Sequence, residues 1–248
     1  MDAMDRRSIL LSGAAVLAGG AASQAYAAEP SAKEGATRLY ELRNYQLKPG
    51  EAGTMVKAAS TVEHGIRGDK YGKLEGYWWT DIGLLNQVIN LWSYADFNER
   101  ARAHAELAKD AQWAKEYLPL VSPIITRLDI RLLNAVKSPI APASPGNVYE
   151  LRNYRAKPGA AKPWLEIFTA ALPARERHSK IVGLWQTDAS QPNEICHLWA
   201  YKSLNARVEE RNAANKEPEW QNFLANGGKY LDEMNSTIML PAPHSPLV

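Results

Sequence analysis

The chain has 248 residues, enough for two domains of about 100 residues each, and its 46% hydrophobic and 23% charged content is that of an ordinary soluble globular protein. The formal net charge of +2, with both signs interspersed, excludes the concentrated basic face of a nucleic-acid binder, so we expect no nucleic-acid partner. Cys196 is the single cysteine, which excludes an internal disulfide and a cysteine-built metal site.

The N-terminus resembles an export signal. Arg6 and Arg7 open an apolar run that ends near Ala22, and Ala25 and Ala27 supply the small residues that a signal peptidase reads. The run is shorter than the roughly 20 residues needed to span a bilayer, so we expect no stable membrane span. We predict a twin-arginine signal over residues 1–27 and a periplasmic mature protein that begins with a polar lead-in, residues 28–37.

The mature chain is a tandem duplication. The segment 40–50 recurs as 149–159 with only two differences, and equivalent residues there are 109 positions apart. Further along, the spacing is 107. The residues repeated at that spacing, each first-copy residue written with its counterpart, are Gly76/Gly183, Trp78/Trp185, Thr80/Thr187, Asp81/Asp188, Asn86/Asn193, Leu91/Leu198, Trp92/Trp199, Tyr94/Tyr201, Asn98/Asn205, Arg100/Arg207 and Trp113/Trp220. We divide the chain into repeat 1 (38–135), a proline-rich linker (136–146), repeat 2 (147–241) and a C-terminal tail (242–248).

The elements of repeat 1 follow from periodicity and end signals. In chain order we expect a strand at 38–47, an amphipathic helix at 51–66, two strands joined by a hairpin at 76–80 and 87–94, a helix from 96 to 118 and a strand at 124–133. Asp96 with Glu99 predicts a capping box, and Ser203 is the cap residue of the second copy.

That order predicts an α+β fold made of two ferredoxin-like (βαββαβ) repeats. Each repeat would have an antiparallel sheet with helices on one face. We expect the two free faces to pack against each other as a barrel-type pseudo-dimer, with a cavity between the sheets.

Strand alternation divides the third strand of each repeat into a mixed aromatic and polar face and a purely apolar face. We assign the apolar face, which carries Leu91 and Leu198, to the helices and the mixed face to the barrel interior. The same alternation places the polar residues of each first strand inward. The resulting ligand-lining candidates are Glu41, Arg43, Tyr45, Asn90, Trp92, Tyr94, Glu150, Arg152, Tyr154, Trp199 and Tyr201. The alternative is that the aromatic residues only pack the barrel and that the pairs Glu41/Arg43 and Glu150/Arg152 are structural ion pairs, or point to solvent if the two strand faces are reversed.

His197 is the candidate catalytic residue, because an imidazole in an aromatic pocket can act as a general base or an axial metal ligand. The alternative is a hydrogen-bonded core histidine. Cys196 adjoins it but points to the opposite strand face, so the two are not a nucleophile and base pair. Three other histidines, His64, His104 and His178, lack the paired spacing of metal ligands. We therefore expect no metal site.

Several motifs together resemble the NIPSNAP family. They are Tyr-Glu-Leu-Arg-Asn-Tyr at the start of each repeat, residues 81–94, Gly-Leu-Trp-Gln-Thr-Asp at 183–188 and His-Leu-Trp-Ala-Tyr at 197–201. The resemblance implies the dimeric α/β barrel superfamily, whose relatives include cofactor-free monooxygenases, haem-degrading enzymes and haem peroxidases. The family itself has no single established reaction. Asn90 departs from the pattern, since the second copy has His197 there, so any role of that histidine belongs to one repeat.

The first hypothesis is an exported binding protein that holds a small apolar or aromatic ligand between its two sheets, without a cofactor. One alternative is an enzyme of that superfamily, either a cofactor-independent monooxygenase or a haem-binding protein with His197 as the axial ligand. Another is a partner-binding protein with a filled barrel. Whether the chain is catalytic and whether it forms a homo-oligomer stay open.

Overall fold

The structure, a computed structural model, describes residues 38–248. The predicted export signal and the lead-in up to residue 37 lie outside the described residues. Within residues 38–248, no helix is both long enough and apolar enough to cross a membrane.

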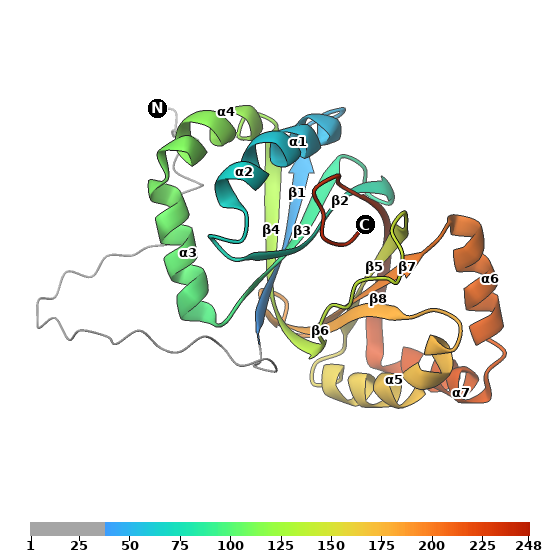
Figure 1. Cartoon of the computed structure of the whole chain (residues 1–248). Coiled ribbons are helices and arrows are strands. Elements are labelled where there is room, and N and C mark those ends of the chain that lie inside the picture. The colour runs from blue at the N-terminus through green and yellow to red at the C-terminus, as the bar shows by residue number, and fades with distance from the viewer. Residues whose placement is uncertain (1–37) are drawn as a thin grey trace, which may run out of the picture. The chain divides into compact units, whose positions relative to one another are not determined.

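Each repeat has the predicted order of strand, helix, strand, strand, helix, strand (Figure 1). The elements of repeat 1 are β1 (Leu39–Leu47), α1 (Ala52–Ala58), η2 (Ala59–Glu63), α2 (His64–Arg67), β2 (Lys73–Ile82), β3 (Gln87–Tyr94), α3 (Phe97–Lys109), η3 (Trp113–Tyr117), α4 (Leu118–Val121) and β4 (Ile125–Lys137). Those of repeat 2 are β5 (Val148–Ala156), α5 (Ala161–Glu176), β6 (Ile181–Ala189), β7 (Glu194–Tyr201), α6 (Leu204–Ala214), α7 (Pro218–Gly227), η4 (Gly228–Tyr230) and β8 (Leu231–Pro241).

The eight strands form one closed antiparallel barrel in the order β1-β3-β2-β8-β5-β7-β6-β4. Repeat 1 contributes β4-β1-β3-β2 and repeat 2 contributes β8-β5-β7-β6, and the two are joined by β2 with β8 and by β4 with β6. The sheets therefore meet edge to edge, where we expected two stacked faces with a cavity between them. Closure pairs the edge strands that two separate sheets would leave open.

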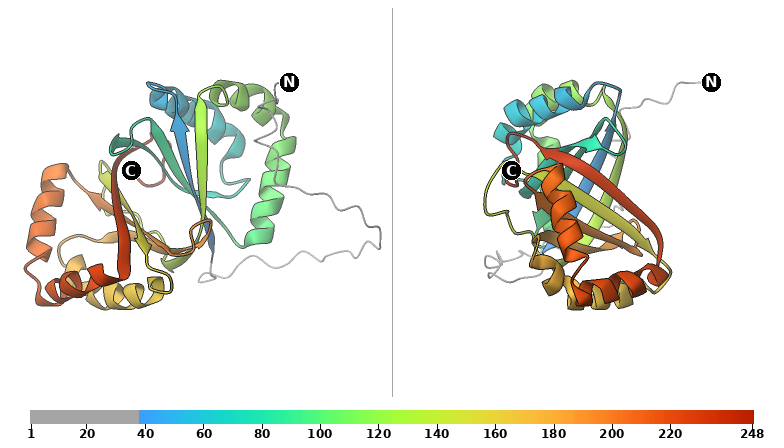
Figure 2. Two further views of the ribbon diagram at one scale, coloured as in Figure 1. Left: turned by 180° about the vertical axis from the view of Figure 1, so that it is seen from behind. Right: turned by 90° about the vertical axis from the view of Figure 1, so that its right-hand side faces the viewer.

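The helices of repeat 1 lie on one side of the barrel and those of repeat 2 on the opposite side (Figure 2). Both predicted helix caps are confirmed: the Asp96 side chain accepts from the Glu99 N–H at 2.7 Å and the Ser203 hydroxyl from the Ala206 N–H at 3.1 Å. The single helix expected over residues 96–118 is wrong, because α3 ends at Lys109 and Asp110 is extended. The Asp110 carboxylate accepts two N–H groups of the following turn and so starts a separate helical segment.

The barrel interior is apolar and packed. Its residues are Tyr40, Leu42, Trp78, Ile89, Leu91, Leu133, Tyr149, Leu151, Val182, Trp185, Cys196, Leu198, Met239 and Leu247. The cavity found there measures about 10 Å³, which is room for at most about one water molecule. The interior is thus filled, as the partner-binding alternative expected.

The assignment of strand faces was therefore reversed. The apolar face of β3 and β7, with Leu91 and Leu198, lines the barrel interior, and the mixed face of Trp92, His197 and Trp199 faces the helices. The physical reason is that the closed interior offers few hydrogen-bond partners, whereas the helices bring cationic side chains to the mixed face.

The repeated Gly-x-Trp motif belongs to this interior. The indole of Trp185 lies against Gly183, where a Cβ atom would sit 2.2 Å from its Cη2 atom, and Trp78 lies against Gly76 in the same way at 2.0 Å. Glycine is required at both positions because the buried ring occupies the space of a side chain.

Candidate functional site

The largest cluster of buried residues in repeat 2 lies between the barrel sheet and helices α5 and α7 and surrounds a cavity of about 170 Å³. The residues that line it are Arg152, Tyr154, Trp164, Phe168, Arg175, His197, Trp199, Arg211, Asn215, Trp220, Phe223, Leu224, Gly227, Gly228, Leu231 and Met234. Cavities of about 150 Å³ hold benzene, so this space suits one aromatic ring with a short substituent.

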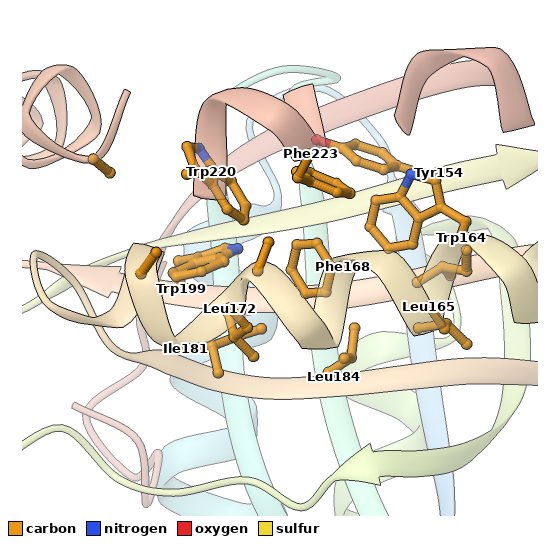
Figure 3. Packing of buried hydrophobic residues seen from close by; sticks show 14 of the residues in the cluster. Tyr154, Trp164, Leu165, Phe168, Leu172, Ile181, Leu184, Trp199, Trp220 and Phe223 are labelled. Carbon is orange, nitrogen blue, oxygen red and sulfur yellow. The ribbon is translucent and has the colours of Figure 1, made fainter. Parts of the chain in front are cut away.

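The cavity walls are mainly aromatic. Trp164 and Phe168 of α5 stack with their ring centroids 4.7 Å apart, and Trp220 and Phe223 of α7 pack across from Phe168 (Figure 3). Trp199 rises from β7 to complete the wall. Several of these rings meet edge to face, a geometry that aromatic pairs prefer.

His197 lies in this wall and has one free donor. Its Nδ1 atom accepts the indole N–H of Trp199 at 2.7 Å, so the proton of a neutral imidazole is on Nε2. Nε2 is buried and has no partner within residues 38–248. Burial lowers the pKa of His197 well below its usual value, and the charge of Arg152 lowers it further. At neutral pH the side chain is therefore neutral and has an unpartnered Nε2–H donor, in place of the general base that we considered.

Three arginines also reach the cavity, and one carboxylate organises two of them. Glu150 is fully buried and contacts Arg152 at 3.3 Å, Arg207 at 2.7 Å and, more weakly, Arg211 at 3.9 Å. Burial alone would raise the pKa of Glu150, but the hydrogen bond from Arg207 and the charge of Arg152 lower it to about 2. Glu150 itself stands behind the arginines and does not line the cavity.

Arg175 of α5 is the third arginine and is 2% exposed. It donates to the Tyr201 hydroxyl at 3.1 Å and to Ser179, and its guanidinium lies 4.7 Å from the Trp199 ring centroid. Among residues 38–248, no carboxylate lies within 4 Å of it. Burial consequently lowers the pKa of Arg175.

In repeat 1, the ligand-lining candidates Glu41, Arg43 and Tyr45 are hydrogen-bonded to one another and to helix α3. Glu41 is fully buried and accepts from Arg43 at 2.7 Å and from Arg100 at 2.8 Å, and His104 lies 3.2 Å away. Burial alone would raise the pKa of Glu41, but His104, Arg43 and Arg100 hold it well below its usual range. Arg43 also donates to the Tyr45 hydroxyl at 2.7 Å.

Asn90 of repeat 1 has the structural role of His197. Its Oδ1 atom accepts the indole N–H of Trp92 at 3.0 Å, as His197 Nδ1 accepts that of Trp199. The Tyr94 hydroxyl accepts from Arg67 at 3.1 Å. Asparagine thus keeps the bond to tryptophan, and the histidine of the second copy adds a ring N–H that has no partner within residues 38–248.

Of the predicted candidates in repeat 2, Arg152, Tyr154, His197 and Trp199 line the cavity, while Glu150 and Tyr201 hold arginines in place. Sequence reasoning missed every residue that the helices supply. The principal ones are Trp164, Phe168, Arg175, Arg211, Trp220 and Phe223. The apolar side of 161–176 carried the signal, but a pocket assigned to the barrel interior gave no reason to examine it.

Haem does not fit this site. Coordination of a metal by a neutral histidine needs a free lone pair on the nitrogen that faces it, and the bond from Trp199 places a proton on Nε2 of His197. A cavity of about 170 Å³ also has room for one small ring and is too small for haem. Within residues 38–248, no group of three or more His, Cys, Asp or Glu side chains is arranged to hold a metal ion.

Known proteins resemble this chain along most of its length. NipSnap homolog 2 from Homo sapiens is 30% identical, covering 87% of this chain and 77% of its own, and NipSnap homolog 3B from Mus musculus is 27% identical, covering 84% and 85%. A proposed monooxygenase from Fusobacterium nucleatum shares the fold, with a TM-score of 0.64 and 13% identity, covering 84% of this chain and 94% of its own. The NIPSNAP family model matches residues 40–139 and 149–246, one match for each repeat. The chain is therefore a member of the NIPSNAP family, with two copies of the family's domain.

Proposed function

We propose that repeat 2 binds a small aromatic molecule in the cavity between the barrel sheet and α5 and α7. The observation that carries the proposal is an aromatic cavity lined by His197, whose buried Nε2 atom has no hydrogen-bond partner within residues 38–248. A buried donor without a partner costs about 1–3 kcal/mol, and a ligand acceptor would recover that cost. Apolar walls with a few convergent polar groups are the usual construction of a small-molecule site.

The candidate site therefore lies between the barrel sheet and the helices, because the barrel interior is packed. Ligand uptake is best measured by native mass spectrometry of the purified protein and by titration of tryptophan fluorescence with single-ring aromatic compounds. Trp220→Ala should weaken binding because it removes one wall of the cavity. Trp113→Ala, the same change at the equivalent position of repeat 1, is the matched control and should leave binding unchanged. Equal affinity in both variants, or no binding in the unmodified protein, would overturn the proposal.

A second candidate function is cofactor-independent oxidation of an electron-rich phenol. The site favours it because the N–H of His197 and the guanidinium groups of Arg152 and Arg175 would stabilise a phenolate, the form that reacts most readily with oxygen. The fold is also that of a proposed monooxygenase. For a dihydroquinone, the substrate would lose two electrons and two protons to O₂, giving the quinone and hydrogen peroxide. Oxygen uptake with phenols and dihydroquinones should be lost in His197→Ala, and inactivity of both proteins would rule this reaction out.

A further inference from the structure

The two repeats place an arginine at the same point of the fold. Arg67 and Arg175 each donate through Nη2 to a tyrosine hydroxyl at 3.1 Å, that of Tyr94 in repeat 1 and of Tyr201 in repeat 2. Each guanidinium also lies on the equivalent tryptophan ring of its repeat, at 3.4 Å and 4.7 Å from the centroid. The arginines are therefore structural equivalents, although the sequence spacing changes between them.

The change in spacing has a visible cause. Equivalent residues are 109 positions apart at Tyr40 and Tyr149 but 108 apart at Arg67 and Arg175. In repeat 1 the helix contains the π-helical turn η2, which accommodates one extra residue, whereas α5 is an uninterrupted α-helix. Counting back four residues from each arginine then equates Glu63 with Ala171.

Repeat 1 therefore carries its own carboxylate beside this arginine. Glu63 is 4% exposed, its Oε1 atom lies 3.7 Å from Arg67 Nη1, and its Oε2 atom accepts the Tyr117 hydroxyl at 2.8 Å. Burial raises the pKa of Glu63, and the charge of Arg67 and the bond from Tyr117 oppose that rise. The arginine, the aromatic ring and an anionic group thus occur together within the protein itself.

Repeat 2 has the same arginine and ring but lacks both oxygen-bearing partners. Ala171 takes the place of Glu63. Phe223 takes the place of Tyr117, because Tyr117 packs on Trp113 with ring centroids 4.4 Å apart and Phe223 packs on Trp220 with centroids 4.8 Å apart. The cavity there gathers three guanidinium groups, and Glu150 is the one carboxylate paired with any of them among residues 38–248. The cavity of repeat 2 is thus lined by aromatic rings and by three arginines, whose positive charges outnumber the paired carboxylate.

We propose that the ligand of repeat 2 is an aromatic carboxylate whose anionic group binds Arg175 and the Nε2–H of His197. It would replace the internal Glu63 carboxylate of repeat 1. This inference rests on the proposed function, since it adds a charge to the aromatic ring assigned to the cavity. Arginine and carboxylate form strong charge-assisted hydrogen bonds, and burial between aromatic walls strengthens them.

Three small compounds separate the ring from the charge. Benzoate has both, benzamide has the ring without the charge, and acetate has the charge without the ring. Isothermal titration calorimetry of the full mature chain should give benzoate at least about tenfold tighter binding than either of the others, because hydrogen bonds to charged groups contribute more than neutral ones. Equal affinity for benzoate and benzamide would overturn the carboxylate inference and leave aromatic binding standing. Equal affinity for acetate and benzoate would instead overturn the aromatic pocket, and binding of none of the three would overturn both.

Two variants test the residues. Arg175→Gln should weaken benzoate binding by at least about tenfold and change benzamide binding little. Ala171→Glu places a carboxylate where repeat 1 has Glu63. It should also weaken benzoate binding, because the new carboxylate competes with benzoate for Arg175. Ala170→Glu, on the exposed side of the same helix, adds the same charge and should bind benzoate normally. Normal benzoate binding by folded Arg175→Gln would refute the assignment, whether or not Ala171→Glu folds.

Discussion

Methionine substitutions at the two equivalent arginines should have very different effects on stability. Arg67 faces the buried carboxylate of Glu63 at 3.7 Å, so Arg67→Met leaves an uncompensated buried charge. Removing one member of a buried ion pair costs about 3–5 kcal/mol. Arg175 has no carboxylate within 4 Å among residues 38–248, so Arg175→Met removes a buried charge without leaving a directly paired carboxylate behind.

The magnitude for Arg175→Met follows from two opposing effects. The variant loses hydrogen bonds to Tyr201 and Ser179, worth about 1 kcal/mol each. Removing the charge also relieves the desolvation penalty of a buried ion, which offsets this loss of about 2 kcal/mol. The net change should therefore be near zero, and the two variants should differ by about 3 kcal/mol, or about 6–12 °C in Tm at 2–4 °C per kcal/mol.

Urea and thermal unfolding of dialysed, ligand-free protein, followed by circular dichroism, would measure the difference. The stability lost in Arg67→Met should also shrink as the pH falls, because protonation of Glu63 removes the unpaired charge. An equal loss of stability in the two variants would refute the reasoning, since it would mean that Arg175 is neutralised within the protein.

Four further predictions concern packing, pH, the histidine and export. Gly183→Ala should destabilise the fold by about 1–3 kcal/mol, because its Cβ atom would lie 2.2 Å from a buried indole. Gly65→Ala lies in a helix with open space around it and should stabilise the fold by up to about 1 kcal/mol. Chemical denaturation of both variants would measure the difference. The pKa of Glu150 falls from 4.5 to about 2 on folding, so its contribution to stability is complete above pH 4.5 and disappears as the pH falls towards 2; the stability gap between wild type and Glu150→Gln should close over that range. His197→Asn should keep the fold, because asparagine makes the equivalent bond in repeat 1, but lose at least about tenfold in benzoate affinity by calorimetry. Secretion by a host with a twin-arginine pathway should yield a periplasmic protein whose N-terminal sequence begins near Ala28, and cytoplasmic retention of the full-length chain would contradict the export prediction.

The repeats and the order of their elements could be predicted because they depend on local and repeated patterns. The two cap residues are examples, since Asp96 and Ser203 act on N–H groups three positions away. The alternation of β7 also grouped His197 with Trp199 correctly.

The position of the site could not be predicted in the same way. Alternation divides a strand into two faces but does not say which face meets the helices, and the closed barrel required the apolar one inside. Arg175 lies on a helix, and its equivalence to Arg67 depends on the extra residue held by a π-helical turn. The role of Glu63 follows from that same turn and is visible only when both repeats are compared in space.

The two halves of the barrel belong to one polypeptide, and this has an evolutionary consequence. In a barrel assembled from two identical subunits, every mutation appears twice, so a residue that fills one site fills both. In a fused chain each copy accumulates its own mutations. Repeat 1 thus has Glu63 bonded to Tyr117, whereas repeat 2 has Ala171 and Phe223 at these places and a cavity lined by Phe223, a difference that two identical subunits could not carry.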